Sequence, residues 1–518
     1  MQPVRKLAVI AVTLLAALAA AWPASAAGQP SPVQGITLVS GPPEARGATV
    51  SAADLGHGLV AGTTPYVHPD GFVYTDVFAP FLWSAHASSS PSSSSSVLFQ
   101  LPANLATFPS IYLPNAITPN GRTVVGGVIF PEELFTEPWA WTQAGGLQFL
   151  QLPANTQYGG GAVGVSSDGS IIAGTLAGRF VPWQAATWVN GQLETLPTSQ
   201  VWSQVHAISG DGSTVVGAAG RSLGTMQADR WVNGIEQPLS TGGLNPVSSA
   251  ALFVADNGVA FGTATLSSGL TLLLRWAPDG TLTVLTPPDG LSVASLSSID
   301  SVGGAAGGAL AEKTSCISFL DPACNQEPFV WTAQDGFTIL SQGTLGQSLD
   351  QFGDASTVTS VSDGGRVAVG ALQPRESING FPPHVGVVWT SQSGPVSVND
   401  LMSSFGQPNP DYFSAGSVSP NGTTVLAFGN APNEAVNDTG SLLLDLNPLW
   451  TGQPGSVTAT QPSSGTPQAA QSTEDALGQQ LMSLPADVLG EAQSWPGAAS
   501  ILGQIDLLPG DATASSGG

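Results

Sequence analysis

The side chains best suited to chemistry in this chain lie in segments between apolar stretches, and one of them is a lone lysine. Lys313 is the single lysine after residue 26; it directly follows Glu312 and shortly precedes Asp321. An ammonium group beside carboxylates can hold an anion, and a carboxyl group whose pKa is shifted by a neighbouring charge can exchange a proton with a substrate. We therefore take Asp321 and Glu312 as candidate catalytic residues and Lys313 as a candidate ligand-binding residue. The alternative is that all three are solvated loop residues.

Further candidates for ligand binding come from other connecting segments of the chain. They are Arg375, His68, Asp70, Tyr74, His384 and His206. Cys316 and Cys324 enclose seven residues, and in an oxidising compartment such a pair is expected to form a disulfide. A metal pair or a catalytic thiol is the alternative, but no further cysteine and no histidine nearby in the sequence supports it. We accordingly predict no metal and no cofactor.

The elements that would position these residues are set by an internal repeat. A glycine that ends an apolar run is followed fourteen residues later by a tryptophan in four places: Gly127/Trp141, Gly174/Trp188, Gly217/Trp231 and Gly262/Trp276. Asp-Gly or Asn-Gly turns flank these positions, and such turns between apolar runs are typical of β-hairpins. One unit is therefore predicted to be four short strands, over 162–166, 170–173, 184–189 and 192–196. Repeats of roughly 40 to 50 residues indicate a solenoid, a propeller or an array.

The ends of the repeat region predict a closed ring. The last unit stops after its third strand near Asn447, whereas residues 36–40 read as a fourth strand without a unit of its own. A spare strand at the start and a missing one at the end fit an all-β, eight-bladed β-propeller over residues 36–447, closed by the N-terminal strand. Closure removes exposed sheet edges. Seven blades is the alternative, because the first unit, around Trp83, is irregular.

The best-preserved unit resembles a known family. Residues 209–217 read Ser-x-Asp-Gly-x-x-Val-Val-Gly, and residues 231–239 read Trp-x-Asn-Gly followed by a closing Leu. This pattern resembles the HAF-type repeats of bacterial extracellular proteins over roughly residues 49–447. The resemblance implies a secreted β-propeller and says almost nothing about activity. The first unit departs from the pattern, and the last lacks its tryptophan.

The two ends of the chain read differently from the repeats. Residues 1–26 have the basic start, apolar core and Ala-Ser-Ala ending of a signal peptide, which predicts a secreted, periplasmic or outer-surface protein. No apolar run is long enough to predict a transmembrane anchor. Residues 448–472 are predicted to be a flexible linker, and 473–518 a tail with short helices. That tail would either pack on the propeller or join copies of the chain into a homo-oligomer.

The net charge of the chain limits the classes of molecule that it could bind. Removing Arg5 and Lys6 with the signal peptide takes the net charge from −24 to −26, so we predict no binding to nucleic acid, because an acidic surface repels phosphates. Only 9% of residues are charged, against a typical value of about 25%. That composition favours an acid-stable protein, with an ordinary secreted protein as the alternative.

Loop lengths predict where a ligand would bind. The glycine-to-tryptophan distance exceeds fourteen residues in three units: it is 21 for Gly62/Trp83, 23 for Gly308/Trp331 and 19 for Gly370/Trp389. In a ring these longer loops share one face, and long loops on a rigid scaffold commonly carry function. We therefore predict that this face binds a small anionic molecule or a glycan. The alternatives are an acid-active hydrolase, for example one like the tetrathionate hydrolase of acidophiles, and a cell-surface lectin.

Overall fold

The computed structural model describes most of the repeat region. The described residues are 36–39, 49–67, 73–84, 95–102, 109–130, 135–154, 158–178, 181–312, 326–340, 356–372, 385–390, 394–404, 411–430 and 439–446. The predicted signal peptide, linker and C-terminal tail lie outside these ranges, as do Cys316 and Cys324. β-Strands are the main regular structure of the described chain.

Strands that follow one another in the chain pair antiparallel within most sheets. The largest sheet contains β2 (Thr49–Asp54), β3 (Leu59–Val67), β4 (Val73–Ser84), β5 (Ser95–Leu98), β6 (Ser110–Ile117), β7 (Thr123–Phe130), β8 (Phe135–Thr142) and β9 (Gly146–Phe149). Three four-stranded sheets follow: β10 (Tyr158–Val165), β11 (Ile171–Gly178), β12 (Gln184–Val189) and β13 (Gln192–Thr195); β14 (Trp202–Ile208), β15 (Thr214–Gly220), β16 (Gln227–Val232) and β17 (Ile235–Glu236); β18 (Ser248–Val254), β19 (Ala260–Thr265), β20 (Thr271–Trp276) and β21 (Leu282–Leu285).

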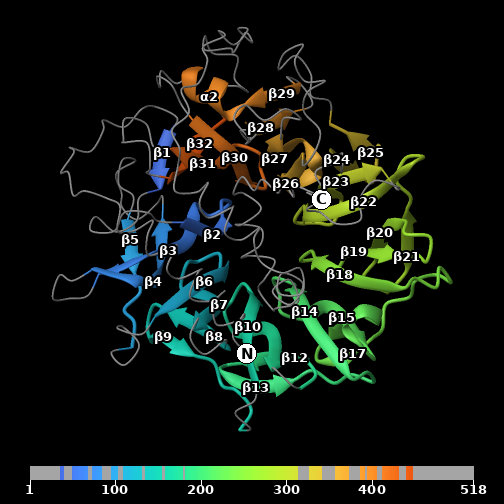
Figure 1. Ribbon diagram of the computed structural model, residues 1–518, viewed down its shortest axis with the longest axis horizontal. Coiled ribbons are helices and arrows are strands. Elements are labelled where there is room, and N and C mark those ends of the chain that lie inside the picture. Colours follow the sequence, from blue (N-terminus) through green and yellow to red (C-terminus); the bar gives the residue numbers. More distant parts are fainter. Residues whose placement is uncertain are drawn as a thin grey trace, which may run out of the picture.

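Three more four-stranded sheets complete the described chain. They are β22 (Leu291–Ile299), β23 (Ala305–Glu312), β24 (Gln326–Thr332) and β25 (Gly336–Ile339); β26 (Thr357–Val361), β27 (Val367–Leu372), β28 (Val385–Thr390) and β29 (Gly394–Ser397); and β30 (Asp411–Val418), β31 (Thr424–Asn430) and β32 (Thr439–Asp445) with β1 (Ile36–Val39). Figure 1 shows the sheets following one another around a common centre, with β2, β6, β10, β14, β18, β22, β26 and β30 innermost. The arrangement is that of a β-propeller.

The tight turn between the first and second strands is built by the repeated Ser-x-Asp-Gly motif. In the sheet of β14, Ser209 Oγ donates to Asp211 Oδ1 at 2.6 Å, and that oxygen also accepts from Ser213 N at 2.9 Å. Ser209 Oγ in turn accepts from Thr214 N at 3.0 Å. Gly212 has a φ of 73°, a backbone conformation that a residue without Cβ adopts at no steric cost. The Asp-Gly dipeptide is thus explained by local geometry.

The N-terminal strand pairs with the last strand of the chain. β1 runs antiparallel to β32, with Ile36 opposite Leu444 and Val39 opposite Ser441. β1 therefore lies in the place that the sequence predicted, as the fourth strand of the sheet of β30 to β32.

The first two units are joined more closely than the others. β4 pairs in parallel with β6, Val77 opposite Ser110 and Phe78 opposite Ile111. This pairing merges β2 to β5 and β6 to β9 into one eight-stranded sheet. The irregularity of the first unit in the sequence corresponds to this lateral pairing.

The apolar core lies between neighbouring sheets. Trp188, Trp231 and Trp276 are fully buried in clusters with residues of the preceding sheet. Their indole nitrogens donate to the carbonyls of Gln151 (2.7 Å), Pro197 (2.6 Å) and Ser240 (2.8 Å), which follow the outermost strands β9, β13 and β17 of those sheets. The tryptophan of the repeat therefore packs each sheet against the one before it.

The repeated glycine allows a close backbone approach, and its position corrects one sequence assignment. A Cβ on Gly217 would overlap the carbonyl oxygen of Gln204 on the innermost strand, and one on Gly126 would overlap that of Leu113. Gly126, and not Gly127, is therefore the equivalent residue in the second unit, and its distance to Trp141 is fifteen residues. Adjacent glycines look alike in a sequence; only the carbonyl beneath one of them separates the two.

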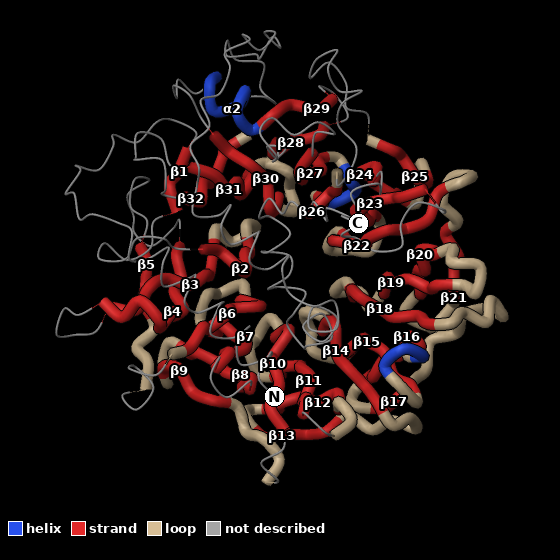
Figure 2. Tube along the Cα trace, viewed as in Figure 1, coloured by secondary structure: helices blue, strands red, loops and turns tan. Residues whose placement is uncertain are grey.

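Within the described ranges, one short α-helix interrupts the strand pattern. α2 (Val398–Ser404) follows β29 at the rim of its sheet (Figure 2). Ser397 Oγ accepts a hydrogen bond from Asp400 N at 2.9 Å, as an N-terminal cap does. Its own side chains Val398, Leu401 and Met402 are buried. Two single 3-10 turns among the described residues, η1 (Leu223–Thr225) and η3 (Asp363–Gly365), lie in connections.

Candidate functional site

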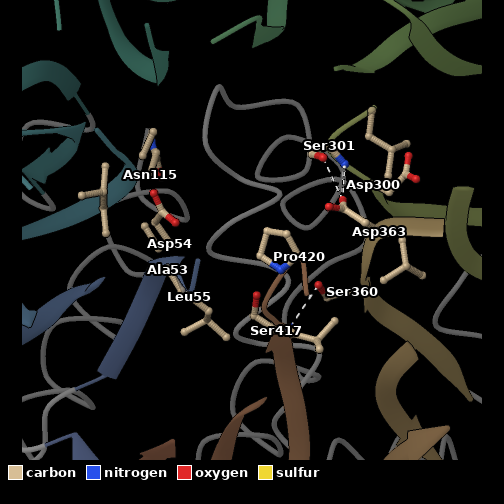
Figure 3. A pocket seen from close by; sticks show the side chains of 16 residues that line it. Ala53, Asp54, Leu55, Asn115, Asp300, Ser301, Ser360, Asp363, Ser417 and Pro420 are labelled. Atoms are coloured by element: carbon tan, nitrogen blue, oxygen red, sulfur yellow. Dashed lines mark hydrogen bonds between the residues drawn. The ribbon is translucent and has the colours of Figure 1, made fainter. Parts of the chain in front are cut away.

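A cavity of about 430 Å³ lies where the innermost strands end at the tight turns. Its walls come from β2, β6, β22, β26 and β30 and the turns that follow them (Figure 3). Its polar lining residues are Asp54, Asn115, Asp300, Ser301, Ser360, Asp363 and Ser417. Alanine, valine, isoleucine, leucine and proline supply the rest. The cavity is thus a mixed surface with carboxylates on opposite sides.

Two of those carboxylates tie neighbouring sheets together. Asp300 is 2% exposed; its carboxylate accepts from Gly304 N at 2.6 Å and from Gly364 N of the next sheet at 3.0 Å. Asp363 reciprocates by accepting from Ser301 N at 3.2 Å and from Ser301 Oγ at 2.8 Å. Each residue therefore satisfies a backbone donor in the other's turn.

This fastening continues along the same face. Ser167 N donates to Gly210 O at 2.7 Å, Gly210 N to Asp256 Oδ1 at 2.8 Å, and Asp363 N to Pro420 O at 2.8 Å. Each bond joins the tight turns of two successive sheets. We call this series of bonds the turn girdle.

Asp54 lies across the cavity from Asp363 (Figure 3). Its carboxylate oxygens lie 3.1 and 3.0 Å from Nδ1 of His57, three residues later. His57 is largely exposed, and ion pairs in such positions contribute little to stability. Asp54 is therefore the carboxylate at this cavity that a ligand could engage with the least disruption of the fold.

A bulge in each innermost strand adds a second set of links. Asn115 Nδ2 donates to Ala162 O at 2.8 Å, and Thr359 Oγ1 donates to Ala415 O at 2.6 Å. His206 Nδ1 lies 2.9 Å from Ala251 O. Each donor sits at the irregularity of its own strand, and each acceptor just before that of the next sheet. The bulge places a side chain where it can reach across.

His206 is held in one neutral tautomer. A carbonyl only accepts, so Nδ1 carries the proton toward Ala251 O, and Nε2 accepts from Gln204 Nε2 at 2.7 Å. Burial lowers the pKa of His206, and the hydrogen bond to Ala251 partly opposes that shift. The sequence placed His206 in a connection; it lies instead inside β14.

The other predicted site residues lie at the opposite end of the strands or outside the described ranges. Tyr74 is the second residue of β4, and Glu312 is the last of β23. Both positions adjoin the connection between the second and third strands of a sheet, away from the tight turns. His68, Asp70, Lys313, Asp321, Arg375 and His384, with both cysteines, lie outside the described residues.

The cavity was missed in the sequence because its acids belong to turn motifs. Asp363 sits in an Asp-Gly turn, which reads as structural, and Asp300 precedes an ordinary Ser-Val-Gly-Gly run. The cavity could have been predicted from position, because the first strand of every propeller unit ends at the central channel. Within the described ranges, no three His, Cys, Asp or Glu side chains are grouped to hold a metal ion.

Among known proteins, this chain is similar to solved structures. No protein-family model matches the chain, and no curated protein matches its sequence. Similar folds include the putative TolB of Agrobacterium tumefaciens, at 12% identity and a TM-score of 0.32 over 48% of this chain and 84% of that one. The β-propeller domain of the trilobed protease from Pyrococcus furiosus is 11% identical, with a TM-score of 0.39 over 68% and 96%.

A structure from a study of two prolyl endopeptidases is 10% identical to this chain, with a TM-score of 0.46 over 68% of this chain. The match spans about half of that enzyme, 49% of its chain. Likeness at this level says nothing about activity. Among the helices in the described ranges, none has the length and apolar character to cross a bilayer.

Proposed function

We propose that this chain is an exported, closed, eight-bladed β-propeller that binds a ligand on the face opposite the turn girdle. Eight blades are supported by the six four-stranded sheets and by the eight-stranded sheet, which divides between β5 and β6 into two units. Closure is supported by the pairing of β1 with β32. It is also supported by Trp83 of the first unit, which packs in one cluster with Leu426 and Leu443 of the last.

The observation that carries the binding proposal is the difference between the two faces: bonds between sheets lie on one, and the longer loops leave from the other. On one face the carboxylates of Asp256, Asp300 and Asp363 are committed to bonds between sheets, while that of Asp54 is paired with His57. The ends of β3, β23 and β27 point to the other face, since each second strand runs away from its tight turn. There the chain continues into residues 68–72, 313–325 and 373–384, which contain the candidate residues of the longer loops.

The ligand is proposed to be a small anion. Lys313 and Arg375 lie in two of those three segments, in a chain whose net charge is −24, so a cation there has few neighbours of its own sign. Histidines at 68 and 384 would add positive charge in acid. A glycan held by aromatic side chains is the second ligand class to test.

The experiment uses the chain from residue 27 onward, with tetrathionate, sulfate and a glycan mixture as probes at pH 3.5. Calorimetry measures binding, and release of thiosulfate or sulfate measures turnover. We expect Lys313→Met and Arg375→Gln each to weaken anion binding about tenfold or more, consistent with the loss of one charge-assisted contact. Arg122→Gln is the matched control, because Arg122 is exposed on the tight-turn face.

Two outcomes would reject the binding proposal. Equal weakening by all three substitutions would mean a non-specific charge effect. Turnover that disappears in Asp321→Asn would identify a hydrolase instead. Because Lys313 is the single lysine of the secreted form, protection of its amine from an acylating reagent provides an independent reading of the same site.

A further inference from the structure

Asp229 is a carboxyl group buried between two sheets. It lies in the middle of β16, opposite Gly217 of β15, and is 3% exposed. Side chains two residues apart on a strand share a face, so Asp229 lies on the side of Trp231, whose indole nitrogen donates to Pro197 O at 2.6 Å. Asp229 therefore faces the preceding sheet, formed by β10 to β13.

A second carboxyl group meets it from the neighbouring strand. Glu236 of β17 is opposite Trp231 and is therefore diagonal to Asp229 on the same side of the sheet. The Glu236 carboxylate also accepts from Thr198 Oγ1 at 2.9 Å, from Ser199 N at 3.0 and 2.9 Å, and from Ser199 Oγ at 3.3 Å. Thr198 and Ser199 follow β13 of the preceding sheet. Glu236 is thus the clamp between the two sheets.

Burial disfavours the charged form of a carboxyl group, and a second carboxylate nearby disfavours it further. Asp229 is the more buried of the two, and Glu236 accepts from donors of the preceding sheet, so the proton belongs on Asp229. Burial first, and then the charge of Glu236 and its hydrogen bond, raise the pKa of Asp229 to about 7, against an opposing hydrogen bond from Arg230 N at 2.8 Å.

The other ionisable groups near this face do not replace that proton. Arg230 points to the following sheet, where its guanidinium donates to Pro278 O at 2.9 Å; it also donates to Oε1 of Gln237, just after β17 of its own sheet, at 3.0 Å. Glu194 on β13 is exposed. His206 on β14 is engaged with Gln204 and Ala251.

We propose that Asp229 and Glu236 form an acid-closed latch between the sheets of β10 to β13 and β14 to β17. In acid Asp229 is protonated, and Glu236 stays bound to Thr198 and Ser199. In neutral medium Asp229 carries a negative charge in a buried place beside Glu236, and the clamp on the 197–199 segment loosens. The latch makes the fold tighter in acid than at neutrality.

The sign of the effect follows from proton linkage. The native state holds a proton on Asp229 up to about pH 7, whereas an unfolded aspartate loses it near pH 4. Stability from this group is therefore fully present below about pH 4 and is lost as the pH rises to about 7. Over that interval the unfolding equilibrium constant rises by up to about tenfold per pH unit.

The test is urea unfolding of the secreted chain at a series of pH values from 4 to 8. Asp229→Asn replaces the protonated acid by an amide that can still donate to Glu236. The unfolding equilibrium constant of this variant is expected to depend less steeply on pH than that of the wild type, by a factor of up to ten per pH unit. Glu236→Gln, which removes the second charge, should also flatten the profile. Glu194→Gln, an exposed acid on the neighbouring strand, should leave the profile unchanged.

Hydrogen exchange supplies a local reading. We expect the amide of Ser199 to exchange faster at pH 8 than at pH 5, after correction for intrinsic rates, in the wild type but not in Asp229→Asn. A pH profile of Asp229→Asn identical to the wild type would overturn the proposal. Equal protection of Ser199 at the two pH values would also overturn it.

Discussion

At the scale of single residues, the repeat depends on a position where only glycine fits. The repeated glycine inside the second strand, such as Gly217 in the middle of β15, lies directly against a carbonyl of the innermost strand, just before its bulge. The bulge brings that carbonyl close and at the same time turns a side chain such as His206 toward the next sheet. The bulge and the glycine therefore act together: the bulge brings the carbonyl close, and the glycine leaves room for it.

The first prediction concerns that glycine. We expect Gly217→Ala to destabilise the chain by about 3 kcal/mol, the upper range for overpacking a well-filled interior, because the new Cβ would overlap the carbonyl of Gln204. Gly224→Ala is the control, since a Cβ at that exposed position meets nothing within 4 Å. Urea unfolding of both variants gives the comparison. Similar midpoints for the two would contradict the close-approach argument.

At the scale of elements, the strand that matters most is the shortest in its sheet. β1 has four residues, yet it covers the outer edge of β32, whose Leu442 and Leu444 are buried. Without β1, the last sheet would end in an unpaired edge, and unpaired apolar edges pair with other chains.

The second prediction is the effect of removing β1. A chain that starts at residue 41 is expected to melt at least about 5 °C lower than one that starts at residue 35, because β32 loses its hydrogen-bond partner. It is also expected to associate, which light scattering during the melt would record. The chain that starts at 35 keeps β1 and serves as the control. Equal melting temperatures would mean that β1 does not support the ring.

At the scale of the whole molecule, aspartates in different environments change the stability of the fold in opposite directions as the pH changes. The backbone N–H of Ser170, with the hydroxyls of Ser166 and Ser170, lowers the pKa of Asp168 to about 2. Hydrogen bonds lower the pKa of Asp211 and of Asp279 in the same direction. Asp229 is shifted upward. The exposed turn aspartates therefore keep their charge to a lower pH than a free aspartate, whereas the buried Asp229 keeps its proton to a higher pH.

The third prediction is a stability maximum near pH 4. A lowered native pKa contributes stability above the unfolded value of about 4 and loses it as the pH falls toward 2; a raised one loses it as the pH climbs toward 7. Thermal melts from pH 2 to pH 8 should therefore be highest near pH 4.

Asp168→Asn tests the acid side of that profile. Asn120 and Asn421 already occupy the same turn position in other units, where they accept from Arg122 N at 2.9 Å and from Thr423 N at 3.1 Å. We therefore expect the variant to melt like the wild type at pH 6 and to lose less stability between pH 4 and pH 2. A steeper loss in acid would contradict the assigned direction.

Much of the fold could be predicted because its rules act over a few residues. The Ser-x-Asp-Gly turn, the four-strand unit and the spare N-terminal strand all depend on local hydrogen bonds, alternation and chain order. The helix over Val398–Ser404 was also within reach, because Ser397 and Asp400 have the spacing of a helix cap. The proposed long-loop site stays a prediction, as its main residues lie outside the described ranges.

The sequence by itself determined the β-hairpins and the order of the sheets around the centre. Only the tertiary structure decided which side chains meet across sheets: Asp300 with the turn of Asp363, more than sixty residues later in the chain, and Glu236 with Thr198 and Ser199. It also decided that β4 joins β6 and that Gly126, not Gly127, is the repeated glycine. The physical reason is that turn and strand preferences are local free energies, whereas contacts between sheets depend on how far each sheet is rotated and shifted against its neighbour.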